Sequence, residues 1–103
     1  AVYESKKAIR TDPKLAAPHL ILAQTYLDQH FVNLGLQHFE KAIELAPQDS
    51  VTRSRYAYAL GTQEDWAKST AEFQKALELN PKYAEAHIGL AWTLGSQGKT
   101  DEA

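Results

Sequence analysis

Four histidines are the residues of this chain that could bind a metal ion, because imidazole is a common zinc ligand. His19 and His87 stand far apart in the sequence (87 − 19 = 68), so we do not expect them to reach one ion. His30 and His38 flank an expected turn and have no third ligand at a useful spacing. The sequence has no cysteine, which removes thiolate ligands. We therefore predict neither a metal site nor a cofactor.

Carboxylates and a Gly-Lys-Thr sequence are the other candidates for chemistry. Glu64-Asp65 and Asp101-Glu102 precede expected helices, where acidic side chains cap the helix and complement its dipole. The segment 95–100, GSQGKT, ends like a phosphate-binding loop. It lacks the first glycine of the G-x-x-x-x-G-K-[ST] pattern and follows a helix instead of a strand. No Ser–His–acid spacing stands out, so the chain is not expected to be an enzyme.

Charge and composition exclude two further classes of function. The 103 residues have a formal net charge of −2, which gives no basic field to attract nucleic acid. No apolar run approaches the ~18 residues that a membrane-spanning helix needs, so no membrane insertion is expected. Composition does not fix the compartment, since cytoplasm and periplasm are both compatible with a chain that lacks cysteine.

A short segment repeats through the chain at a fixed interval. Phe39–Pro47 (FEKAIELAP) recurs as Phe73–Pro81 (FQKALELNP), and a divergent copy stands at Ser5–Pro13 (SKKAIRTDP). The three prolines are evenly spaced (47 − 13 = 34; 81 − 47 = 34), and we call this spacing the repeat interval. A period of this length indicates an array of stacked structural repeats.

Helical periodicity and stop signals place the elements that position these residues. We predict helices over residues 1–10, 15–28, 34–45, 50–60, 66–79 and 84–94, with caps at Asn33 or a neighbouring residue, at Asp49 or Ser50, and at Asp65. The prolines close the second helix of each pair. The segment 95–98 is predicted to turn the chain, and Thr100 to cap one more helix.

Aligning the copies on their prolines separates framework positions from variable ones. Small residues recur on both helices of a pair, which lets the helix axes approach closely. Phe39 and Phe73 occupy one position and fill the space beside that contact. The small residues are Ala8, Ala42 and Ala76 on one helix, and Ala23, Ala57 and Ala91 on the other.

This pattern resembles the tetratricopeptide repeat over essentially the whole chain. The matching residues are Leu22, Ala23, Tyr26, Phe39, Ala42 and Pro47, then Tyr56, Ala57, Leu60, Phe73, Ala76 and Pro81, then Leu90, Ala91, Leu94 and Gly98. The family's usual Trp is replaced by His19, Arg53 and His87, and its usual Ala by Gly35 and Ser69. The resemblance implies an all-α, right-handed α-solenoid of antiparallel helix pairs. It divides the single domain 1–103 into a partial repeat 1–13, repeats 14–47 and 48–81, and a partial repeat 82–103.

The resemblance also implies that the first helix of each pair lines a concave groove that binds a peptide or helix of a partner protein. Tyr58 and Trp92 are equivalent in successive repeats and are expected to be neighbours there. An alternative is that Tyr58 packs against its neighbouring repeat and Trp92 under a following helix, and Trp66 is expected to pack between repeats. The predicted groove residues are Leu20, Gln24, Asp28, Ser54, Arg55, Tyr58, Thr62, Ile88, Trp92 and Ser96.

Some members of the family clamp a chaperone's C-terminal carboxylate with Lys and Asn in this groove. The corresponding positions here hold Leu20, Gln24, Arg55, Glu85 and Gly89, and only Arg55 is of the needed type. A hydrophobic or mixed peptide is therefore the expected ligand of a non-catalytic scaffold.

Neither end of the sequence shows the polar cap that terminal repeats usually have. We expect either a segment of a longer array or a module that joins copies end to end. Self-association through the helix ends is therefore the alternative function.

Overall fold

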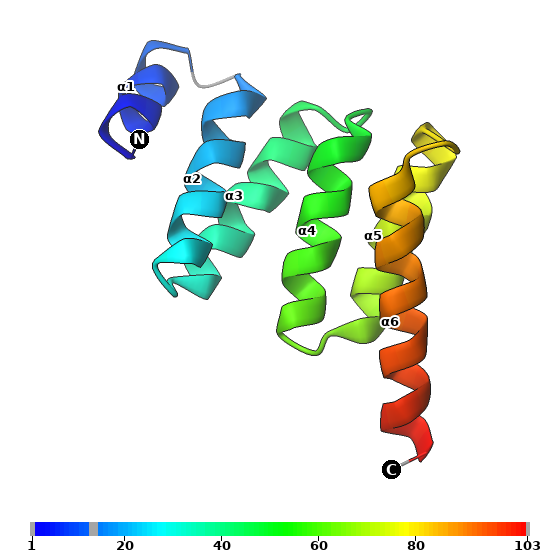
Figure 1. Cartoon of the computed structure of the whole chain (residues 1–103). Helices are drawn as coiled ribbons and strands as arrows, with labels where there is room; N and C mark the ends of the chain where they lie inside the picture. Colours follow the sequence, from blue (N-terminus) through cyan, green and yellow to red (C-terminus); the bar gives the residue numbers. More distant parts are fainter. Residues whose placement is uncertain (1, 13–14, 103) are drawn as a thin grey trace. The chain divides into compact units, whose positions relative to one another are not determined.

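Six α-helices, and no strand, make up the part of the chain that the computed structural model describes, residues 2–12 and 15–102. The chain divides into two compact units, Ala1–Gln48 and Asp49–Ala103. Each unit contains one complete helix pair and one additional helix (Figure 1). The prediction of an all-α fold built from helix pairs is confirmed.

The first unit contains α1 (Val2–Thr11), α2 (Ala16–Asp28) and α3 (Val32–Leu45). A short turn joins α2 to α3, so the two helices run antiparallel, and α1 packs against α2. His30 closes the turn with a left-handed backbone, at φ 67°. The core consists of the residues that the repeat pattern marked as framework, namely Leu22, Ala23, Phe39 and Ala42.

Glycine at position 35 allows α2 and α3 to approach closely. A Cβ atom on Gly35 would lie 3.0 Å from the Ala23 carbonyl oxygen and 2.9 Å from Leu27 Cγ. The small residue therefore meets the requirement for close helix axes that the sequence pattern indicated.

The second unit contains α4 (Ser50–Thr62), α5 (Trp66–Leu79) and α6 (Ala84–Glu102). Glu64 closes its turn at φ 64°, one repeat interval after His30. Ser69, fully buried, donates a 2.6 Å hydrogen bond to the Ala57 carbonyl and so joins α5 to α4. The core comprises Ala57, Phe73, Ala76 and Ala86, with Leu77, Tyr83, Leu90 and Trp92 packed against it.

Two predicted caps differ from the structure. The helix expected from residue 34 begins at Val32 with Phe31 at the N-cap, so Asn33 lies inside the helix. Once His30 has turned the chain, the Gly35 amide already donates to the Phe31 carbonyl at 3.0 Å. Asp65 occupies the N-cap of α5 as predicted, but its side chain makes no capping hydrogen bond. Pro13, the predicted stop after α1, lies outside the described residues.

The predicted turn at residues 95–98 is wrong, because α6 continues through it to Glu102. Gly98 is equivalent to Glu64, yet no glycine among the described residues has a positive φ. Thr100 consequently lies within α6 and not at a helix cap. The turns at His30 and Glu64 are each followed by a helix that packs back. Glycine permits a turn without requiring one, and the helical hydrogen bonds continue through residues 95–98.

Candidate partner-binding site

Tyr58 of α4 and Trp92 of α6 lie side by side in the second unit, as the repeat spacing predicted. Their ring centroids are 5.1 Å apart and the planes are tilted by 32°. Tyr58 is 59% exposed, and Ile88, one turn before Trp92 on α6, is 70% exposed. We call the surface formed by Tyr58, Ile88 and Trp92 the aromatic patch.

Two residues beneath the aromatic patch hold the Trp92 ring in place. Trp66, the first residue of α5, meets Trp92 edge to face with centroids 5.2 Å apart and an interplanar angle of 85°. A Cβ atom on Gly61 would lie 2.6 Å from Trp92 Cη2, so the indole rests directly on the α4 backbone. Trp92 is half-buried as a result. Trp66 therefore packs against α6, a helix of the following repeat.

Polar groups border the aromatic patch along α4 and α6. Arg55 is exposed one turn before Tyr58, and Ser96 is half-buried one turn after Trp92. Thr62 is exposed, and its hydroxyl donates to the Ala59 carbonyl at 2.6 Å. Ser54 is only 4% exposed, so this predicted groove residue offers little surface for a partner.

The predicted groove residues of the first unit follow one face of α2. Leu20 and Gln24 are half-buried there and Asp28 is exposed. Together with the exposed Ile21, they give this face a mixed polar and apolar character.

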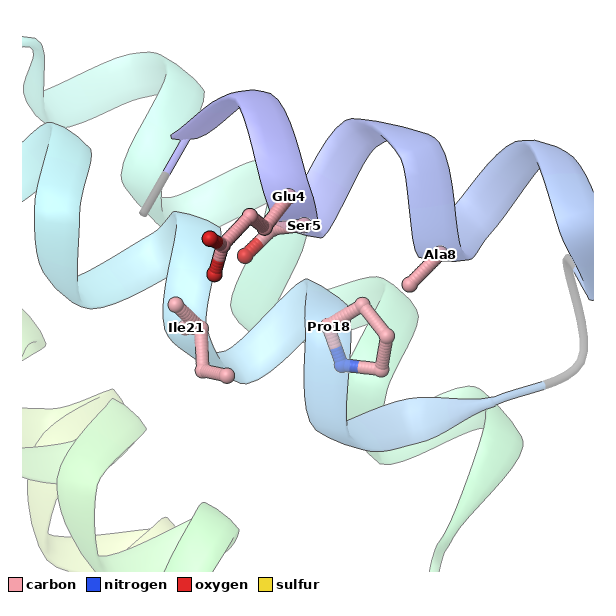
Figure 2. Close-up of a pocket in the computed structure, with 5 residues that line it drawn as sticks. All are labelled: Glu4, Ser5, Ala8, Pro18 and Ile21. Carbon is pink, nitrogen blue, oxygen red and sulfur yellow. The ribbon is translucent and has the colours of Figure 1, made fainter.

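A shallow recess of about 230 Å³ opens between α1 and α2. Figure 2 shows its lining, with the Glu4 carboxylate and the Ser5 hydroxyl from α1 beside Ile21 of α2. Ser5 occupies the repeat position of Phe73 (73 − 5 = 68 = 2 × 34), whose ring fills the equivalent place in the second unit. The recess therefore follows from the loss of an aromatic ring in the divergent first copy.

Histidines form a contact that sequence reasoning missed. His19 of α2 and His38 of α3 approach to 3.1 Å between their Nδ1 atoms, whereas the sequence pattern grouped His38 only with His30. The repeat itself contained the signal, because the positions one repeat interval later hold Arg53 and Glu72, an obvious ion pair. Among the side chains that the structure describes, those of residues 4–12 and 15–98, no group of three or more metal-ligating residues comes together.

One family model matches the C-terminal part of the chain. Residues 72–103 match the tetratricopeptide repeat family. No curated protein matches the chain. No helix in the described part of the chain has the length and apolar character needed to cross a bilayer.

Solved structures of repeat proteins share the fold of the whole chain. A crystal structure of the MamA protein superposes with a TM-score of 0.84 at 25% identity, covering 98% of this chain and 55% of that one. The first repeat domain of Spaghetti (RPAP3), solved with the HSP90 peptide SRMEEVD, gives 0.88 at 18% identity over 94% of this chain and 77% of that one. The tetratricopeptide repeat domain of Arabidopsis OM64 superposes with a TM-score of 0.82 at 20% identity, covering 90% of this chain and 77% of that one. This chain thus spans little more than half of the MamA chains that it resembles.

Proposed function

We propose, on the premise that the chain belongs to the tetratricopeptide repeat family, that it is a non-catalytic scaffold that binds a peptide or helix of a partner protein. The family is a protein-interaction fold, and one structural relative was solved with a bound peptide. The observation that supports the proposal most directly is the aromatic patch, which combines exposed apolar area with a fixed ring.

The shape and chemistry of the aromatic patch favour an apolar anchor in the partner. Aromatic rings give large contact area at a small cost in side-chain entropy, and such residues dominate binding energy at interfaces. Tyr58 adds a hydroxyl that can bond to the partner's backbone, and Arg55 adds one positive charge beside it. We expect a segment with one or two large apolar side chains flanked by an acidic residue.

A free C-terminal carboxylate is not the expected ligand. Glu85, at one of the positions that clamp such a group in some family members, is acidic and accepts a 2.9 Å hydrogen bond from the Tyr83 hydroxyl. Gly89, at another, has no side chain and is buried against Phe73. Arg55 alone would have to neutralise the carboxylate.

The test is a peptide selection on the immobilised chain, followed by titration of the selected peptides with Trp fluorescence as the readout. Tyr58→Ala and Ile88→Ala should each weaken binding about tenfold or more, because both remove exposed apolar contact area of the anchor site. Leu94→Ala, on α6 and 52% exposed, is the matched control and should change affinity little. Circular dichroism should show that all three variants stay folded.

Two results would contradict the proposal. Selected peptides that bind wild type and both patch variants equally would show that the aromatic patch is not the site. If light scattering showed that the two patch variants lose a self-association that wild type has, while peptide binding stays unchanged, the end-to-end assembly alternative would be favoured.

A further inference from the structure

Two histidines form a polar contact between the helices of the first pair. The Nδ1 atoms of His19 (α2) and His38 (α3) lie 3.1 Å apart, with ring centroids 5.3 Å apart. The Tyr26 ring stacks on the His38 ring, with the two ring centroids 5.6 Å apart. His19 is only 7% exposed, so the contact belongs to the packed interface and not to the solvated surface.

The contact requires an unprotonated Nδ1 on one of the two rings. At 3.1 Å one Nδ1 must donate its proton and the other must accept with its lone pair. His19 Nε2 is buried without a partner among the described residues, so a proton there would be an unpaired buried donor. We therefore assign the shared proton to His19 Nδ1 and the accepting lone pair to His38 Nδ1. If His38 became an imidazolium, its Nδ1 would carry a proton and could no longer accept. If His19 became an imidazolium, its Nε2 would carry a buried proton without an acceptor.

The surrounding charges also oppose protonation. The positive charge of Lys41 on α3 repels a proton on His19, and that of Lys6 on α1 repels one on His38, although Lys41 also pairs with Glu44 at 3.5 Å. Burial, followed by the neighbouring His38 and Lys41 charges, lowers the pKa of His19. Burial and then Lys6 lower the pKa of His38. Both histidines thus titrate below the value of about 6.5 that they have when unfolded.

In the second unit, an ion pair occupies the positions equivalent to the two histidines. Positions 53 and 72, each one repeat interval after His19 and His38, hold Arg53 and Glu72. Arg53 Nη1 donates to Glu72 Oε2 at 3.0 Å, and Lys75 Nζ lies 3.6 Å from Glu72 Oε1. Guanidinium and carboxylate groups generally keep their charges between about pH 5 and 8, the range in which histidine titrates.

We propose that the His19–His38 contact is a pH-sensitive switch, which loosens the α2–α3 pair as the pH falls below about 6.5 while the α4–α5 pair stays packed. Because the folded-state pKa values are depressed, the contact contributes its full stability above about pH 6.5, and this contribution is lost as the pH falls further. The equilibrium constant for opening of α2–α3 should rise by up to about tenfold per pH unit for each histidine that gains a proton.

Hydrogen exchange on the whole chain tests this proposal, with rates corrected for the intrinsic pH dependence of exchange. Between pH 7.5 and 5, protection should fall in α2 and α3 and stay nearly constant in α4 and α5. The double variant His19→Arg/His38→Glu transplants the pair of the second unit and should abolish the pH response. His87→Gln is the matched control, since His87 is exposed and lies outside the first unit, and should respond like wild type.

The single variant His38→Gln provides a second readout if the double variant does not fold. An amide can still accept the His19 proton but does not titrate, so the pH response should fall by about half. NMR titration of wild type should place the midpoints of His19 and His38 below 6.5. Midpoints at or above 6.5, or equal loss of protection in both helix pairs, would overturn the proposal.

Discussion

At the scale of single residues, small side chains decide where large ones can lie. The Phe73 ring occupies space that a Cβ atom on Gly89 would enter, at only 2.3 Å from the ring. Trp92 rests on Gly61 in the same manner. Gly95, farther along α6, has nothing within 4 Å of its Cβ position. Gly89 and Gly95 of α6 thus have different roles, and replacing each by alanine should change the free energy of unfolding in opposite directions.

Gly89→Ala should destabilise the chain by about 1–2 kcal/mol. Overpacking a fully buried ring costs about 1–3 kcal/mol, and the better helix propensity of alanine recovers part of it. Gly95→Ala, the matched control, should instead stabilise by up to about 1 kcal/mol, because only propensity changes. Urea unfolding followed by circular dichroism measures both, and equal effects would contradict this account.

At the scale of helices, two aspartates occupy equivalent-looking caps but bond differently. Asp49 precedes α4 and accepts from the Val51 amide at 3.0 Å and from the Thr52 hydroxyl at 2.9 Å. Asp65 precedes α5 and makes no side-chain capping bond. Sequence reasoning placed a cap at both, because the residue type alone does not determine whether the carboxylate reaches the exposed amides.

Asp49→Ala should cost about 1–2 kcal/mol, because it leaves a helix-terminal amide without its acceptor. Asp65→Ala should cost about 0.5 kcal/mol or less, since only a screened interaction with the helix dipole is lost. Thermal unfolding of the two variants beside wild type gives the comparison. A larger loss for Asp65→Ala would show that the two caps have been assigned the wrong way round.

The helices were predictable to the extent that local signals determined them. Helix ends at Asp28, Leu45 and Leu79 followed from turn residues and prolines, and the structure has them there. The predicted break at residues 95–98 failed because glycine permits a turn but does not force one. In the site, repeat spacing brought Tyr58 and Trp92 together correctly. The His19–His38 contact was missed because the histidines were compared with one another and not with their equivalents in the next repeat.

At the scale of the whole molecule, the two units differ in which spectroscopic signal follows their unfolding. Each unit has its own buried core, and repeat proteins are stabilised mainly by contacts within repeats and with nearest neighbours. Both tryptophans of the chain, Trp66 and Trp92, lie in the second unit. Trp fluorescence therefore reports on that unit, whereas circular dichroism reports on all helices.

This difference gives the pH switch a test that needs no substitution. Urea unfolding at pH 7.5 and pH 5.5 should show a larger decrease of the midpoint by circular dichroism than by Trp fluorescence. The depressed pKa values of His19 and His38 destabilise the first unit as the pH falls below about 6.5, and the equivalent positions of the second unit hold no histidine. Equal decreases by both probes would mean that the histidine contact does not act on the first unit separately.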